Sequence, residues 1–87
     1  MANIKSAMKR TLVIRVRTKR NAAYKSMMKT AIRRFEVALK VGDMEKAKIE
    51  LTKAIKTIDK ITTKGVIHKN TASRKKSRLA KAFNRAS

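Results

Sequence analysis

The feature that most restricts the fold is the near absence of residues that interrupt a helix. The chain has 87 residues, no proline and only two glycines, Gly42 and Gly65. Gly can end a helix in a left-handed conformation and Asp can cap the next one, so Gly42-Asp43 predicts a first turn. Lys64-Gly65 predicts a second one. The sequence therefore predicts an all-α fold, with residues 1–87 as one domain and helices at residues 3–40, 44–64 and 67–85.

Apolar residues at helical spacing predict which faces of these helices pack together. The predicted seams are Tyr24, Met28, Ala31, Phe35 and Ala38, widened by Met27, Ile32 and Leu39; then Met44, Ala47, Leu51, Ala54, Ile58 and Ile61, with Ile55 beside them; then Ala72, Leu79, Phe83 and Ala86. Ile49 points away from its seam, and Lys76 takes a position where a core residue is expected. Because short turns make neighbouring helices antiparallel, we expect a three-helix antiparallel bundle.

Helix length adds a constraint on the first helix. The second helix, at about 20 residues and roughly 30 Å, can cover only residues 21–40 of the first. Residues 3–20 are therefore predicted to overhang the core, with Asn3 as the N-cap of the helix. Residues 11–17 are rich in β-branched residues and alternate like a strand. Since no second strand candidate exists to pair with them, we interpret them as helix.

Charge is distributed unevenly along the chain. There are 25 Lys and Arg residues against five acids, which gives a net charge of +20. All five acids lie within residues 36–59, and the two flanking segments are purely basic. Such a surplus indicates a polyanionic partner. The cations of residues 3–20 spread over roughly 220° of the helix at about 100° per residue. A membrane-surface helix gathers its charge on one side, so that alternative is disfavoured.

The sequence gives no sign of catalysis. It has one histidine, no cysteine and no cluster of metal-ligand type, so we predict no catalytic site, no metal and no cofactor. The acids lie mostly on polar helix faces, where pairs with lysines such as Glu36–Lys40 explain them. His68 is interpreted as a backbone or phosphate contact at a helix start. No segment approaches membrane-spanning length, and we expect a cytoplasmic setting.

Several motifs resemble one known family along the full length of the chain. They include MANIKSA at residues 1–7, SMMKT at 26–30, Gly42-Asp43, Lys64-Gly65 and IHKN at 67–70. Together they resemble the bacterial small-subunit ribosomal protein numbered twenty. The resemblance implies a three-helix bundle that binds small-subunit ribosomal RNA directly and early in assembly. It also implies contacts to the 5′ domain and to the long helix near the 3′ end of that RNA.

The resemblance and the charge pattern together supply the candidate RNA-binding residues. The resemblance carries over Asn3, Lys5, Ser6, Lys9, Arg10 and Asn21 on the first helix, and His68, Lys69, Asn70, Arg74 and Lys76 on the third. The charge pattern adds Arg15, Arg17, Lys19, Arg20, Lys25, Lys75 and Arg78. This chain departs from the family pattern at Met8, where a lysine is usual, and in the apolar residues 11–16.

The function that these observations favour is that of a structural component of the small ribosomal subunit, which binds ribosomal RNA and supports subunit assembly. We expect a monomer with few protein contacts and no membrane partner, located in the ribosome of the cytoplasm; an organellar ribosome stays open. The alternative is a nucleoid-type basic protein that compacts DNA.

Overall fold

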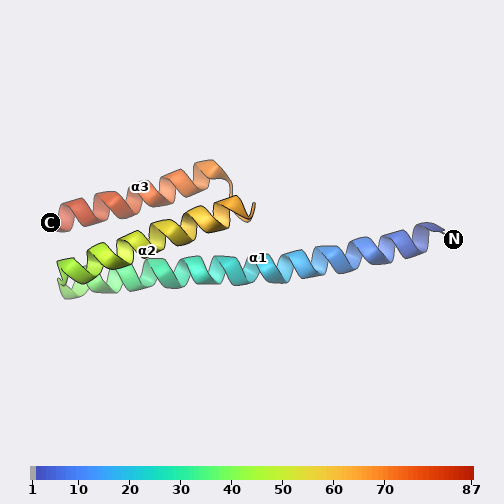
Figure 1. Cartoon of the computed structure of the whole chain (residues 1–87), viewed down its shortest axis with the longest axis horizontal. Coiled ribbons are helices and arrows are strands. Elements are labelled where there is room, and N and C mark those ends of the chain that lie inside the picture. Colours follow the sequence, from blue (N-terminus) through green and yellow to red (C-terminus); the bar gives the residue numbers. More distant parts are fainter. Residues whose placement is uncertain (1) are drawn as a thin grey trace.

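Residues 2–87 fold into three helices joined by two short turns (Figure 1). The computed structural model describes the backbone of residues 2–87 and the side chains of residues 7–87. The helices are α1 (Ala2–Val41), α2 (Met44–Thr63) and α3 (Lys69–Ala86). No strand occurs within residues 2–87, and the β-branched residues 11–17 lie inside α1. The prediction of an all-α fold is confirmed.

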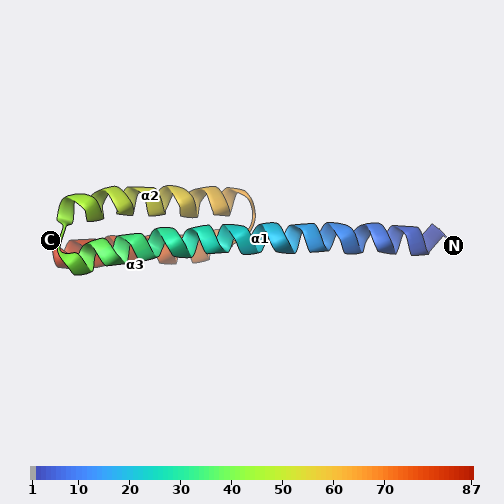
Figure 2. The same ribbon diagram turned by 90° about the horizontal axis from the view of Figure 1, so that it is seen from below.

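The helices run up, down and up, and the first is twice as long as the second. α1 has 40 residues and α2 has 20, so that α1 is roughly 30 Å longer at about 1.5 Å per residue. The molecule is correspondingly elongated, with extents of 64 × 21 × 14 Å, and the N-terminal half of α1 extends beyond the other two helices (Figures 1 and 2). α2 packs against both neighbours, whereas α1 and α3 scarcely meet. The predicted antiparallel bundle with an overhanging first helix is confirmed.

Both turns use the same hydrogen-bond pattern around a glycine. Gly42 has φ +89°, and the amides of Gly42 and Asp43 donate back to Leu39 O and Ala38 O. Gly65 has φ +75°, and the amides of Gly65 and Val66 donate to Thr62 O and Ile61 O. This is the Schellman motif, which satisfies the last carbonyls of a helix and needs a left-handed residue. Gly is the residue that adopts it at least cost.

Side-chain caps start the second and third helices. The Asp43 Oδ1 atom accepts a hydrogen bond from the Lys46 amide at 3.1 Å, as predicted for the N-cap of α2. α3 begins at Lys69 rather than at residue 67, because His68 is its N-cap in an extended conformation (φ −74°, ψ 147°). At the other end of the chain, α1 begins at Ala2. Asn3 therefore lies inside the helix, and its prediction as the N-cap was wrong.

The core is small and rich in alanine. Its buried members are Met28, Phe35, Ala38, Ala47, Ala54, Ile58, Ile61, Ala72 and Leu79, and Phe35, Ile58 and Ile61 are the largest that are fully enclosed. All nine belong to the predicted seams. Met27 is 47% exposed and Ala86 is exposed, so their assignment to the seams was wrong; Val66, Ile67 and Ala82 pack against the core instead. Ile49 is exposed, as predicted.

Replacing Phe35 tests how far the bundle depends on this core. Phe35 is 0% exposed, and we expect Phe35→Ala to lower the free energy of unfolding by about 3–5 kcal/mol through lost burial and a residual cavity. The matched control is Val37→Ala two residues away, because Val37 is 53% exposed. Urea denaturation followed by circular dichroism measures both changes. Equal effects of the two substitutions would contradict this description of the core.

Candidate nucleic-acid interface

The overhang is the part of α1 that has no partner helix; in the structure we define it as residues 7–20. Every side chain in this segment is exposed, and Asn21 is the first that is partly buried. Tyr24 is the first residue of α1 that packs against the core. The overhang is therefore joined to the bundle by continuous helix and surrounded by solvent on all sides (Figure 2).

The overhang carries positive charge without compensation. It contains Lys9, Arg10, Arg15, Arg17, Lys19 and Arg20 and no acid. Among the side chains of residues 7–87, the ion pairs within 4.0 Å are Glu50–Lys53 and Asp59–Lys76. None of the six cations therefore has an acidic partner, and like charges at helical spacing repel one another. The predicted Glu36–Lys40 pair is also not among them, so that prediction was wrong.

Apolar side chains lie between the charges of the overhang. Met8, Leu12, Val13, Ile14 and Val16 are between 48% and 66% exposed. The hydroxyls of Thr11 and Thr18 donate to the carbonyls of Ala7 and Ile14 at 2.9 and 2.8 Å, so these donors are already used within the helix. A partner that encloses the overhang would therefore both neutralise charge and cover apolar surface.

The remaining predicted contacts of α1 lie at the two ends of the overhang. The side chains of Asn3, Lys5 and Ser6 fall outside the described residues. Asn21 is half-buried, and its Oδ1 atom is buried without a hydrogen-bond partner in the structure. Lys25 is exposed. Asn21 thus marks the root of the overhang, where the side chains of α1 begin to face the bundle.

The second predicted cluster lies at the start of α3, which is at the end of the bundle from which the overhang leaves (Figure 1). The His68 Nδ1 atom accepts a hydrogen bond from the Asn70 amide at 3.0 Å. In neutral histidine the proton then lies on Nε2, which can donate to an outside acceptor. Lys69, Asn70, Arg74 and Arg78 are exposed, and Lys75 is half-buried. His68 therefore makes the predicted backbone contact at a helix start.

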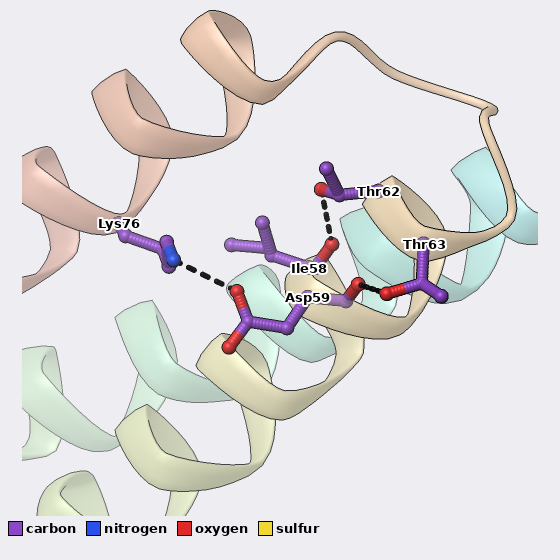
Figure 3. A network of polar contacts seen from close by, with 5 residues as sticks. All are labelled: Ile58, Asp59, Thr62, Thr63 and Lys76. Atoms are coloured by element: carbon purple, nitrogen blue, oxygen red, sulfur yellow. Dashed lines mark hydrogen bonds and ion pairs between the residues drawn. The ribbon is translucent and has the colours of Figure 1, made fainter.

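Lys76 differs from the other cations of this cluster because it is paired within the protein. Its Nζ atom donates to Asp59 Oδ1 of α2 at 2.8 Å, across the α2–α3 interface (Figure 3). This explains why a lysine occupies a position of α3 where the apolar pattern leads one to expect a core residue. Part of its charge is compensated, so Lys76 joins two helices while its cluster neighbours Arg74 and Arg78 remain exposed.

A double-mutant cycle tests this link between the helices. Because Lys76 is 36% exposed and Asp59 is 55% exposed, solvent screens the pair, and we expect a coupling of about 0.2–1 kcal/mol between Asp59→Asn and Lys76→Gln. The coupling should shrink at high salt. Urea denaturation of the four proteins at low and high salt gives the value. A coupling of zero at low salt would show that the contact is not formed in solution.

The structure also gathers cations that the sequence analysis did not select. Arg33 and Arg34 of α1 line a groove together with Lys46, Lys53 and Lys56 of α2. The two arginines belong to the purely basic residues 1–35, whereas the three lysines belong to residues 36–59, which have five acids and five lysines. No local pattern could therefore have identified them as a group.

Other kinds of site were also sought. Within the part of the chain that the structure describes, no three or more His, Cys, Asp or Glu residues lie close enough to hold a metal ion. Over the same residues, no helix combines the length and the apolar character needed to cross a membrane.

These features define a class of protein: small, basic and all-α. A sequence model of the family described as Ribosomal protein S20 matches residues 2–84. The chain belongs to that family. It is 61% identical over 84 residues to the small ribosomal subunit protein bS20 of Carboxydothermus hydrogenoformans, covering 97% of this chain and 90% of the relative. The bS20 proteins of Pelotomaculum thermopropionicum (60% identical, 98% and 97% covered) and Heliobacterium modesticaldum (52%, 99% and 98%) are also similar.

Proposed function

We propose that this protein is a structural component of the small ribosomal subunit that binds ribosomal RNA directly and supports assembly of the subunit. Membership of the ribosomal protein S20 family supports the ribosomal role, and its place is then the ribosome in the cytoplasm. The single observation that carries the RNA-binding role is the overhang, a fully exposed helical segment with six cations and no acid.

The physical reason lies in what the overhang requires of its surroundings. Its cations lie on most sides of the helix, so a partner that touches only one side leaves repulsion unrelieved on the others. Folded RNA can place phosphates from several backbones around one helix. Lys and Arg then make phosphate contacts, while Asn and Ser side chains can reach sugars, whose 2′-hydroxyls distinguish RNA from DNA. The candidate contacts of this kind are Asn3, Ser6, Asn21 and Asn70.

The family resemblance supports a finer proposal about the RNA. We assign the partner segments to the 5′ domain of the small-subunit RNA and to the long helix near its 3′ end. Two cationic clusters on different helices support such an assignment, because the overhang and the start of α3 can each meet a separate backbone (Figure 1).

Salt dependence measures how many phosphates the protein contacts. If about eight phosphates are met, log K for binding to a transcript of the 5′ domain should fall with log salt at a slope of about −6 to −7. The variant Arg15→Gln/Arg17→Gln/Lys19→Gln should reduce the magnitude of this slope by about 2–3. Filter binding or fluorescence anisotropy across a salt series provides the slopes.

The matched control removes three charges elsewhere, in Lys48→Gln/Lys81→Gln/Arg85→Gln, all of which are exposed and lie outside the overhang and the α3 cluster. Its slope should stay close to that of the wild type. A wild-type slope near −2, or equal losses in the two triple variants, would refute the overhang as the main RNA contact.

Competition between nucleic acids separates this function from its rival, a nucleoid-type DNA-compacting protein. We expect structured ribosomal RNA to compete for the protein at a concentration at least tenfold lower than duplex DNA of equal charge. The reason is that only RNA offers 2′-hydroxyls and folded sites made of several backbones. Electrophoretic mobility with both nucleic acids labelled in different colours measures the ratio. Equal affinity for the two would favour the DNA-compacting protein.

A further inference from the structure

We propose that the groove between α1 and α2 binds a further stretch of RNA phosphate backbone, in addition to those met by the overhang and the start of α3. This inference deepens the proposed function and rests on it. The surface concerned lies apart from both the overhang and the start of α3, and none of its cations belongs to the contacts predicted from the sequence.

The groove runs along the α1–α2 interface as two adjoining hollows. Thr30, Arg34 and Glu50 line both of them. Ser26, Met27, Ala31, Lys53, Lys56 and Thr57 complete one hollow, and Arg33, Val37 and Lys46 complete the other. Arg33 and Arg34 thus form one rim and the three lysines the other. From Lys46 to Lys56 the α2 rim extends about 15 Å, a span that several successive phosphates of one strand occupy.

The groove faces away from α3. Asp59 marks the side of α2 that meets α3, because it bonds to Lys76. At about 100° per residue, the groove residues Lys46, Glu50 and Lys53 lie roughly 120–180° from Asp59 around the axis of α2, whereas Lys56 lies about 60° from it. A backbone held in the groove therefore lies on the opposite side of the bundle from one held by α3. The two could be bound at the same time without touching each other.

The charge of the groove fits a polyanion. Five cations line it against one carboxylate, that of Glu50. The Glu50 side chain is only 12% exposed, and its Oε1 atom lies 3.9 Å from Lys53 Nζ, so it is both recessed and partly compensated. The Thr57 hydroxyl already donates to Lys53 O at 2.9 Å. Ser26 and Thr30 also line the groove and belong to residue types that bind phosphate oxygens.

RNA is the occupant that charge favours. A second copy of this chain would bring another +20 to the same surface, so self-association through the groove is opposed by repulsion. An acidic protein segment could match the charge, but an RNA already held by the overhang places further phosphates beside the bundle at high local concentration. The groove is also lined by the apolar side chains of Met27, Ala31 and Val37.

A bridging experiment tests the inference on the full-length protein. Two RNA duplexes, one with a donor dye and one with an acceptor dye, are mixed with limiting wild-type protein, and energy transfer reports their approach. We expect transfer with the wild type and with Lys48→Gln/Lys81→Gln/Arg85→Gln. Arg33→Gln/Arg34→Gln/Lys53→Gln should lose about half of the transfer, because the overhang and the start of α3 can still hold two backbones, while its affinity for a single duplex falls no more than that of the control. Glu50→Gln, which removes the only carboxylate of the groove, should raise the transfer or shift it to lower protein concentration.

The outcomes distinguish this inference from the proposed function. Circular dichroism first establishes that each variant is folded. If the groove variant bridges as well as the control, or if the wild type binds one duplex but never two, the groove inference is wrong while RNA binding by the overhang stands. Failure of the wild type to bind a single duplex would overturn both. If poly-glutamate of equal charge displaces the second duplex as readily as RNA does, the groove belongs to an acidic protein segment and the inference is overturned.

Discussion

Repulsion between like charges is the constraint on which this structure depends. The chain has 25 cations and five acids, and residues 36–59 are the one segment in which the two are balanced. The turn at Gly42 and α2 as far as Asp59 lie within it, and α2 packs against each of the other helices more than they pack against each other. The bundle is therefore built around its one neutral segment. The overhang lies outside this segment, and no acid of the described residues pairs with its six cations.

Much of the fold could be predicted because its signals are local. In a chain without proline, the two glycines with positive φ divide the sequence, and apolar spacing identifies the buried faces. The details that could not be predicted depend on contacts between segments. α3 begins two residues later than predicted, because the ring nitrogen of His68 caps the helix. Lys76 interrupts the apolar face of α3 because it pairs with Asp59 of α2, which no local pattern reveals.

The candidate interface shows the same division between local and distant information. The exposure of residues 7–20 follows from helix length alone, since α2 is half as long as α1. The groove does not follow from any local property, because Arg33 and Lys53 are twenty positions apart and each looks like an ordinary solvated cation in its own segment. Packing α1 against α2 places both of them along one groove, Arg33 in one hollow and Lys53 in the adjoining one. A run of charges can be identified in a sequence, whereas a groove with cations on both rims can be identified only once the two helices are packed together.

The unbroken course of α1 has a mechanical consequence. From Ala2 to Val41 the helix contains neither glycine nor proline, so it has no hinge between the overhang and the core. Whatever grips its first turns also fixes the orientation of the bundle some 30 Å away at about 1.5 Å per residue. The helix is a rigid connector. Two nucleic-acid segments attached at its opposite ends would therefore be held at a fixed angle as well as at a fixed separation.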